Sequence, residues 1–393
     1  MTIAIDAAID AHSDLAGLDF PAFSAWVAAR VGHSARFHRA LYRQFMQTGR
    51  LDPAALPLWR EAEAARPGTI DAITAAVAGS LVPEVTMLTR SDDAELGTTT
   101  KVKCRLADGA EVETVLVPMG LGDPTSPPSP EFVSPSAGLP VPHPRSSRHW
   151  TVCVSTQVGC RMGCHFCHTA SMGLVRNLTA HEIVGQFLAI SAATGVRPRN
   201  LVFMGMGEPL DNAEEVGRAV RVLTDHAGLG LAHRHITVST VGRIEGLRRL
   251  AETDLDRINL AVSLFAADDA VRSIFVPTAK SAPLADLHAA LTDLKLPRGR
   301  RILISLVVIP GINDGQPHVD ALKAWIAGLP VLVNLIPYHP IPGKTWPAPT
   351  SDQVAAMSRR LDEARIPVRI RRTKGEAVMA ACGQLAVERN RSE

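Results

Sequence analysis

Apolar residues recur at different spacings along the chain, and the changes in spacing divide it into regions. Between Phe20 and about Val77 they recur every three to four residues, as in FPAFSAWVAARV and ARFHRALYRQFMQTG. This is the pattern of amphipathic helices that bury one face. Gly49 or Pro53 is expected to end the second of these helices. We therefore predict a small helical accessory domain over residues 1–90.

Alternating apolar and polar residues follow the helical region. The runs VTMLTR and TKVKCRLADGAEVETVLVP have the period of two that is typical of half-buried strands, and we expect them to form a strand pair. Asp108-Gly109 is the predicted hairpin turn. The next segment, from Gly120 to Trp150, is too rich in Pro, Ser and Gly for a packed element. Residues 91–149 are thus predicted to be a β-hairpin followed by a Pro-rich linker.

Short apolar runs alternate with helical segments after Trp150. There are six such runs: TVCVST, NLVFMGM, HITVSTV, INLAVSL, RILISLVVI and VLVNLIP. Strands that alternate with helices form a parallel sheet that is buried on both faces and connected by right-handed crossovers. We predict an α/β fold in which residues 150–375 form a partial (β/α)6 barrel and residues 376–393 a C-terminal segment. In such folds the chemistry lies at the carboxyl ends of the strands.

Composition narrows the class of protein. The 393 residues are 46% apolar and 20% charged, which is ordinary for a soluble enzyme, and no apolar run approaches the roughly 18 residues of a membrane span. The N-terminal segment lacks the basic-then-apolar order of a signal peptide, and six cysteines are too few for a disulfide scaffold. We expect a cytoplasmic protein without membrane contact. Because the net charge is only +2, a nucleic acid would need a local basic face.

Three cysteines lie close together after the first of the six strands, in GCRMGCHFCHTA. Cys160, Cys164 and Cys167 have the spacing of metal ligands, and thiolates select zinc, copper(I) or iron–sulfur clusters. A zinc ion would require His165 or His168 as its fourth ligand. A 4Fe-4S cluster bound by three thiolates instead leaves one iron without a protein ligand. That position is then expected to bind a small molecule.

The spacing of the three cysteines, with Phe166 before the last of them, resembles the signature of radical S-adenosylmethionine (SAM) enzymes. Over roughly residues 20–390 the chain also resembles the RNA adenine methyltransferases of the RlmN and Cfr group. The segments that carry this resemblance are, in order, VETVLVP, CVSTQVGC, RNLTAHEIVGQ, FMGMGEPL, ITVST, LAVSL, VNLIPYHPIPG and AACGQL. The resemblance implies a radical-SAM barrel, a 4Fe-4S cluster on the three cysteines, and SAM on its open iron.

The resemblance also implies a mechanism with two further cysteines. One SAM methylates Cys382, and a second SAM yields an adenosyl radical that removes a hydrogen atom from the S-methyl group. The resulting carbon radical adds to carbon 2 or carbon 8 of adenine, so that two SAM molecules are used per turnover. Cys153 matches the thiol that then attacks Cys382, forming a disulfide and releasing the product. Glu113 matches the proposed proton acceptor.

A set of SAM contacts follows from the same resemblance: Gly207, Glu208, Ser239, Ser263, Leu264, Phe265 and His339. Three positions depart from the usual residues of the family. Phe265 stands in place of His, His339 in place of Asn, and Ser305 in place of an acidic residue. Because a Phe side chain offers no hydrogen bond, we expect these departures to bear on the identity of the substrate. Cys104 matches no motif, and we predict that it is buried in a strand.

Three basic stretches are candidate phosphate contacts: Arg234-His235, Arg298–Arg301 and Arg369–Lys374. The target base must leave its stack to react, which favours single-stranded or loop regions of rRNA or tRNA. We further expect a monomer that receives electrons from a reducing partner such as flavodoxin or ferredoxin. Two alternatives stay open: the same chemistry on a small nucleoside or metabolite, and a zinc-stabilised, non-catalytic RNA-binding protein.

Overall fold

The computed structural model describes residues 14–52, 57–77, 82–93, 97–121, 148–251, 257–294, 296–297, 299–371 and 373–387. Pro53, most of the Pro-rich linker, Arg298, Arg372 and the last six residues lie outside the described residues. The boundaries proposed above for the four regions of the chain stay a prediction. Among the described residues, no helix is both long enough and apolar enough to cross a lipid bilayer.

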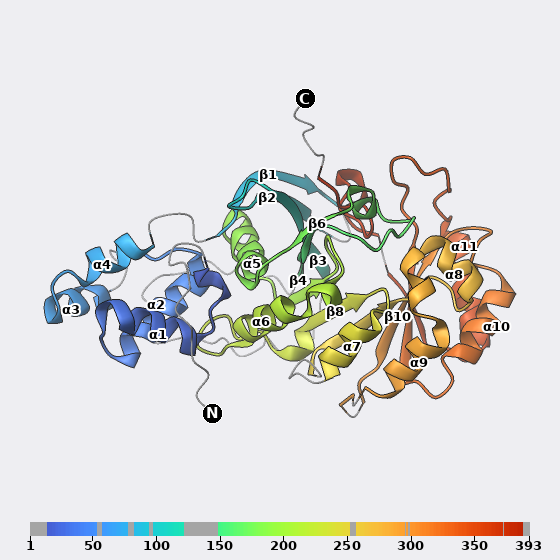
Figure 1. Ribbon diagram of the computed structural model, residues 1–393. Coiled ribbons are helices and arrows are strands. Elements are labelled where there is room, and N and C mark those ends of the chain that lie inside the picture. Colours follow the sequence, from blue (N-terminus) through green and yellow to red (C-terminus); the bar gives the residue numbers. More distant parts are fainter. Residues whose placement is uncertain are drawn as a thin grey trace.

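Four helices form one end of the molecule (Figure 1). They are α1 (Phe20–Val31), α2 (Ala35–Thr48), α3 (Pro57–Ala65) and α4 (Thr69–Ala76), preceded by the 3-10 turn η1 (Leu15–Gly17). Asp19 and Ser34 cap the amino termini of α1 and α2, because their side chains accept hydrogen bonds from Ala22 N and Phe37 N. As predicted, Gly49 ends α2, in the left-handed conformation that glycine adopts without strain.

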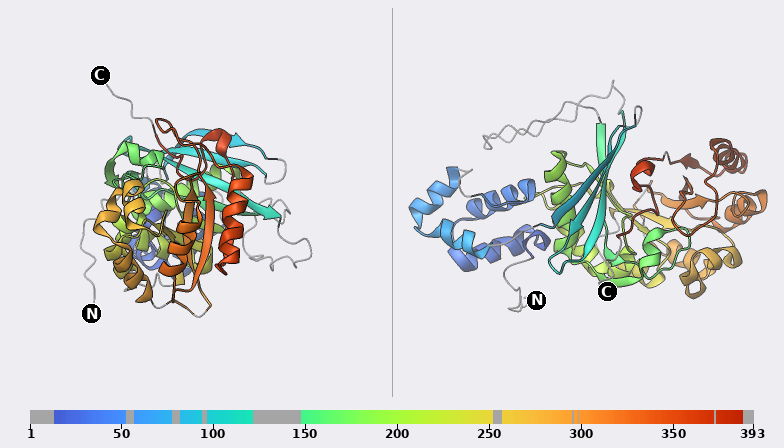
Figure 2. Two further views of the ribbon diagram at one scale, coloured as in Figure 1. Left: turned by 90° about the vertical axis from the view of Figure 1, so that its right-hand side faces the viewer. Right: turned by 90° about the horizontal axis from the view of Figure 1, so that it is seen from above.

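The predicted strand pair is a sheet of three antiparallel strands. These are β1 (Glu84–Ser91), β2 (Thr99–Arg105) and β3 (Glu111–Leu121). The prediction of a pair was wrong because the run from Lys101 to Pro118 contains two strands, which turn back at residues 106–110. β3 also pairs with the first barrel strand, β4, so that the hairpin and the barrel belong to one sheet. Seen from above, these strands cross between the N-terminal helices and the barrel (Figure 2).

The barrel contains the six predicted strands and one more, all parallel. In sheet order the strands are β4 (Arg148–Cys153), β7 (Asn200–Phe203), β8 (Ile236–Thr240), β9 (Asn259–Ser263), β10 (Ile302–Val308), β11 (Val331–Pro337) and β12 (Val368–Ile370). The additional strand, β12, pairs with β11 at the sheet edge. The sheet therefore begins with antiparallel strands and continues as an open, partial barrel.

Helices follow the barrel strands and cover their outer face (Figure 1). They are α5 (Ala180–Thr194), α6 (Ala213–Thr224), α7 (Ile244–Ala251), α8 (Asp269–Phe275), α9 (Leu284–Thr292), α10 (Gln316–Trp325) and α11 (Ser351–Glu363). Short 3-10 turns lie in the connections: η3 (His168–Met172), η4 (Pro209–Asn212), η5 (His233–His235), η7 (Pro277–Ser281) and η8 (Glu376–Val378). A separate two-stranded sheet, β5 (Gln157–Gly159) with β6 (Leu174–Asn177), encloses the cysteine loop.

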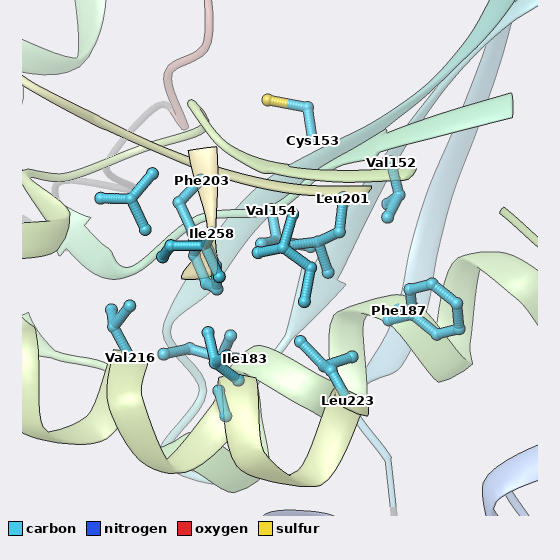
Figure 3. Packing of buried hydrophobic residues seen from close by; sticks show 14 of the residues in the cluster. Val152, Cys153, Val154, Ile183, Phe187, Leu201, Phe203, Val216, Leu223 and Ile258 are labelled. Atoms are coloured by element: carbon cyan, nitrogen blue, oxygen red, sulfur yellow. The ribbon is translucent and has the colours of Figure 1, made fainter. Parts of the chain in front are cut away.

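The main hydrophobic core lies between the sheet and the helices. Val152 and Val154 point into this layer, toward Ile183 and Phe187 of α5 (Figure 3). Cys153 lies between them in sequence, and its side chain points to the opposite face of the sheet, the inside of the barrel (Figure 3). This alternation is the ordinary period of a strand. The outer face of β4 thus supplies stability, and its inner face presents a thiol.

Candidate active site at the mouth of the barrel

The three-cysteine loop connects β5 to η3 above the carboxyl ends of the strands. Cys160 and Cys164 are buried and Cys167 is half-buried. Burial raises the pKa of all three thiols, to about 12 for Cys160, and neighbouring thiols of the loop raise the pKa of Cys160 and Cys164 further. Mutual effects of this kind arise only between groups that lie close together. The loop therefore gathers three thiols whose ionised form requires a positively charged partner.

Backbone and ionic contacts hold the loop in place. The Cys160 N–H donates a hydrogen bond to Gly173 O (2.9 Å), and the His165 N–H donates to Phe275 O (2.8 Å). Asp211 in η4 binds Arg161 of the loop (2.6 Å) and Arg243 before α7 (2.7 Å). The loop is therefore fixed to Gly173 after η3, to the end of α8 and to η4.

The donors of the loop fit an iron–sulfur cluster. One loop supplies all three thiols, and thiolates are soft ligands that suit iron–sulfur chemistry. In the part of the chain that the structure describes, no three His, Cys, Asp or Glu side chains form the arrangement of a single-metal site. The three thiols face an apolar surround that includes Met162, Phe265 and Tyr338.

Gly207 and Glu208 follow β7, beside the cysteine loop. Gly207 has φ +104°, and a Cβ atom there would lie 2.7 Å from Gln157 Cβ, so that only glycine fits. The Glu208 carboxylate is buried and accepts hydrogen bonds from Leu210 N (3.0 Å) and Val241 N (2.9 Å). Burial raises its pKa to about 7. Two lone-pair sites per oxygen leave this carboxylate able to accept an ammonium group as well.

Ser239 and Ser263 lie on adjacent strands, with their hydroxyl oxygens 3.4 Å apart. Leu264 and Phe265, which follow Ser263, are fully buried. Phe265 has φ +67°, which is strained for an aromatic residue. Its carbonyl accepts a hydrogen bond from Asn313 Nδ2 (2.9 Å), which stabilises this conformation.

The ring of Phe265 packs in an aromatic stack beside the cysteine loop. Its centroid lies 5.1 Å from that of Phe166, with the two rings within 6° of parallel, and 4.4 Å from that of Phe275. Phe275 in turn contacts Trp346 at 5.1 Å. Because Phe166 immediately precedes Cys167, the unusual Phe265 supports the backbone of the cysteine loop.

We expect Phe265→Ala to lower the free energy of unfolding by about 3–5 kcal/mol, since a fully buried aromatic ring is removed from a packed stack. Urea unfolding followed by circular dichroism measures this change. Ile274→Ala is the matched control, because Ile274 lies one residue from Phe275 and is 59% exposed. A loss in Phe265→Ala no larger than in the control would contradict the supporting role.

Cys153 and Cys382 line one cavity of about 500 Å³ inside the barrel. Burial, and then the neighbouring Cys382, raise the pKa of Cys153 to about 12, whereas the nearby Arg371 lowers it. Cys382 also contributes to the raised pKa of Cys167. Cys382 therefore lies close both to Cys153 and to the cysteine loop. All six cysteines are free thiols in this structure, and Cys104 is completely buried in β2, as predicted.

The AACGQL segment that carries Cys382 is held from two sides, by η3 and by the connection after β11. Gly383 O accepts a hydrogen bond from the His168 N–H (2.6 Å), and Leu385 O accepts one from the Thr169 hydroxyl (2.5 Å). Gln384 Nε2 donates to Pro340 O (3.3 Å). These bonds connect the segment to the cysteine loop and to the connection after β11.

Glu113 is buried in β3 and does not lie on a solvated face. Its Oε1 is 2.9 Å from Lys101 Nζ on β2, and its Oε2 accepts a hydrogen bond from Ala386 N (3.1 Å). Lys101 also donates to Met379 O (3.4 Å). Lys101 belongs to no sequence motif, so the sequence did not predict its contact with Glu113. The strand register pairs Glu113 with Lys103, and Lys101 lies two residues from Lys103 on the same face of β2.

Two of the departures noted above lie in the same cavity. Ser305 and His339 both line it, together with Cys153 and Cys382. Burial lowers the pKa of His339. Glu376, whose Oε1 lies 3.6 Å from His339 Nδ1, raises this pKa, and the charge of Arg371 lowers it. Cys153, Cys382, Ser305 and His339 thus line the same cavity. Among the residues that line it there is none of Gly207, Glu208, Ser239 and Ser263.

Comparisons with known proteins agree with this geometry. Residues 154–322 match the model of the Radical SAM superfamily. The chain is 38% identical over 381 residues to the dual-specificity RNA methyltransferase RlmN of Sorangium cellulosum, covering 93% of each chain. It is 39% identical over 292 residues to the RlmN of Syntrophobacter fumaroxidans, covering 74% of this chain and 77% of the relative.

A solved structure shows the same architecture. The crystal structure of a radical SAM methyltransferase from Sphaerobacter thermophilus is 33% identical, with a TM-score of 0.77 over 95% of this chain and 99% of that one. The fold and the cysteine loop therefore define a radical SAM enzyme. Within that class, the chain belongs to the RlmN family of dual-specificity RNA methyltransferases.

Proposed function

We propose that this protein methylates a ring carbon of adenine, carbon 2 or carbon 8, in structured rRNA or tRNA, through an S-methylcysteine at Cys382. The observation that carries this proposal is that Cys382 shares one cavity with Cys153 and also lies close to Cys167 of the cysteine loop. A methyl carrier must reach both the thiol that releases the product and the SAM bound at the cysteine loop. Cys382 lies close to the Cys153 thiol and to this loop.

Cys160, Cys164 and Cys167 are proposed to hold a 4Fe-4S cluster, and Gly207, Glu208, Ser239, Ser263, Leu264, Phe265 and His339 to surround SAM. When bound, the reduced cluster supplies the electron that cleaves SAM to a 5'-deoxyadenosyl radical. The buried Glu208 carboxylate is placed to bind the methionyl ammonium group. The aromatic stack around Phe265 excludes water from this side of the loop.

Two SAM molecules are proposed per turnover because Cys382 performs two tasks. Its sulfur first accepts a methyl group by displacement, and the methyl carbon then loses one hydrogen atom and bonds to adenine. The adduct gives up one electron, which an oxidised cluster held by the three loop cysteines would accept. Cys153 attacks the sulfur of Cys382, so that an S–S bond forms and the bond between this sulfur and the methylene carbon breaks; the methylene carbon keeps the electron pair and takes up a proton, which gives the methylated base. Only the thiolate attacks, and burial raises the pKa of Cys153 to about 12. Arg371, which favours the thiolate, is therefore proposed to assist this step.

Glu113 is proposed to take the proton that leaves the ring carbon. Its ion pair with Lys101 and its hydrogen bond from Ala386 hold the carboxylate beside the segment that carries Cys382. The cluster must be reduced before the reaction and the disulfide after each turnover, which calls for an electron donor such as flavodoxin or ferredoxin. We further propose that the protein is a cytoplasmic monomer.

The cations in the cavity favour RNA as the substrate. Arg234, Arg369, Arg371 and Lys374 line it, and they come from two of the three basic stretches identified in the sequence. A phosphodiester backbone would match these positive charges, whereas a small nucleoside without phosphate would not. Incubation of rRNA and tRNA with the protein and radiolabelled SAM, followed by nucleoside analysis, tests the proposal: label is expected in methyladenosine, and label in free nucleosides alone would favour a small substrate.

We expect SAM to bind more weakly as the pH falls through 7. Glu208 binds the ammonium group only as a carboxylate, and because its pKa is raised to about 7, acid neutralises it in that range. The ionised fraction falls about fivefold between pH 7 and pH 6, and the Kd of SAM should rise by the same factor. Equilibrium dialysis measures this change. Glu208→Gln should bind SAM weakly and without this pH dependence, and an equal dependence in the variant would contradict the assignment.

A further inference from the structure

Four basic residues lie at the amino-terminal end of the barrel strands, opposite the cysteine loop. His149 is the second residue of β4, Arg199 immediately precedes β7, and Arg234 and His235 immediately precede β8. Because the three strands are parallel neighbours, these residues share one edge of the sheet. Burial lowers the pKa of His235, and so do, in order, the charges of Arg199, Arg234 and His149. We call these four residues the basal cation cluster.

The basal cation cluster has neutral partners. His235 Nδ1 lies 2.7 Å from the side-chain oxygen of Asn200, an amide. Within the described ranges, none of these four basic residues is in an ion pair with a carboxylate. His149, Arg199 and Arg234 are exposed. Like charges gathered without counter-charges repel one another and raise the local concentration of anions.

The cluster opens into the cavity that contains Cys382. Arg234 and His235 line this cavity, as do Asn200 and Asn259, which are the first residues of β7 and β9. Cys382 lies at the other end of the strands. The four residues of β7 rise by about 13 Å. Among the described residues that line the cavity, none is Asp or Glu. The cavity is thus a positively charged passage along the height of the barrel.

We infer that the basal cation cluster binds a backbone phosphate of the RNA strand whose adenine reacts at Cys382. The inference rests on the proposed function and adds a second point of attachment to it. Guanidinium groups match phosphate oxygens in a bidentate geometry. Since the cluster and Cys382 lie at opposite ends of one passage, a ligand that reaches both must be extended, as a single-stranded segment of RNA is. The cluster positions the strand and does not touch the reacting atoms.

The double variant Arg199→Gln/Arg234→Gln tests this subsite in the full-length protein with its cluster loaded under anaerobic conditions. The probe is a fluorescein-labelled, single-stranded RNA dodecamer that contains one adenine, and anisotropy gives its Kd across a range of salt concentrations. We expect binding to weaken about tenfold, and the slope of log affinity against log salt to fall by roughly 0.7 for each phosphate that the variant no longer binds. The matched control is Arg221→Gln/Arg359→Gln, which changes two exposed arginines on the outer helices α6 and α11.

The outcomes separate the subsite from the proposed function. Wild-type affinity and salt slope in Arg199→Gln/Arg234→Gln would overturn the subsite and leave the proposed function standing. A wild-type protein that binds no RNA would overturn both. AMP and inorganic phosphate are added as competitors. Complete displacement of the dodecamer by either of them at a concentration near the Kd of the dodecamer would show that the cluster takes a free phosphate group, and would overturn the assignment to RNA.

Discussion

Protein in which Cys153 is replaced by Ala should accumulate RNA that is covalently bound to Cys382. The variant retains the cysteine loop and the methyl carrier, so that it can join the methylene carbon to adenine. It lacks the thiol whose attack releases the product. The two cysteines share one cavity, and among the described residues no other thiol lines it. A nuclease-sensitive band of raised mass on a denaturing gel reports the adduct.

Cys104→Ala is the control for this experiment. Cys104 is also a buried thiol, and burial raises its pKa to about 12, but it lies in β2 and does not line the cavity. Its replacement should produce no adduct. If Cys153 and Cys382 served only in packing, replacing either of them by Ala would lower the stability by about 1 kcal/mol, and neither variant would bind RNA covalently. Normal turnover in Cys153→Ala would exclude Cys153 as the releasing thiol.

Replacing Cys160, Cys164 or Cys167 by Ala should abolish iron binding and methylation in each case. Three thiolates are the whole protein ligand set proposed for the cluster, and loss of one leaves a second iron without a protein ligand. The fold should survive, because the loop lies above the main core and is also held by Asp211 and by backbone bonds to Gly173 and Phe275. Iron and sulfide analysis after anaerobic reconstitution, with circular dichroism, checks both parts.

Cys104→Ala again serves as the control and should bind iron fully. Full iron content in any one of the three loop variants would contradict its assignment as a ligand. Zinc without iron or sulfide in the wild-type protein would instead favour the zinc-stabilised alternative.

The barrel could be predicted from the sequence because its strands and helices follow one regular pattern. Each of the six runs is short and rich in β-branched or other apolar residues, and each is separated from the next by a helix. β12 escaped prediction because it has three residues, two of them exposed, and lies between basic residues. Its pairing with β11 depends on tertiary contacts that no local pattern contains.

The cysteine motif predicted the centre of the site, but the contacts around it depend on distant residues. The aromatic stack joins Phe166 of the cysteine loop, Phe265 after β9, Phe275 at the end of α8 and Trp346 after β11. The alternating pattern of its strand predicts that Glu113 is a surface residue. Only the fold shows that Glu113 is buried against Lys101 and the C-terminal segment. Spacing can thus predict ligands that share one loop, whereas partners brought together by folding require the structure.

The isotopic composition of the product methyl group tests the proposed function most directly. The protein is incubated with RNA and with SAM that carries a fully deuterated methyl group, over several turnovers, and the RNA nucleosides are analysed by mass spectrometry. Because the methyl group on Cys382 loses one hydrogen atom before its carbon bonds to adenine, methyladenosine should retain two deuterium atoms, and the third should appear in 5'-deoxyadenosine. Methyladenosine that retains all three deuterium atoms would show direct transfer from SAM and would contradict a methyl carrier at Cys382.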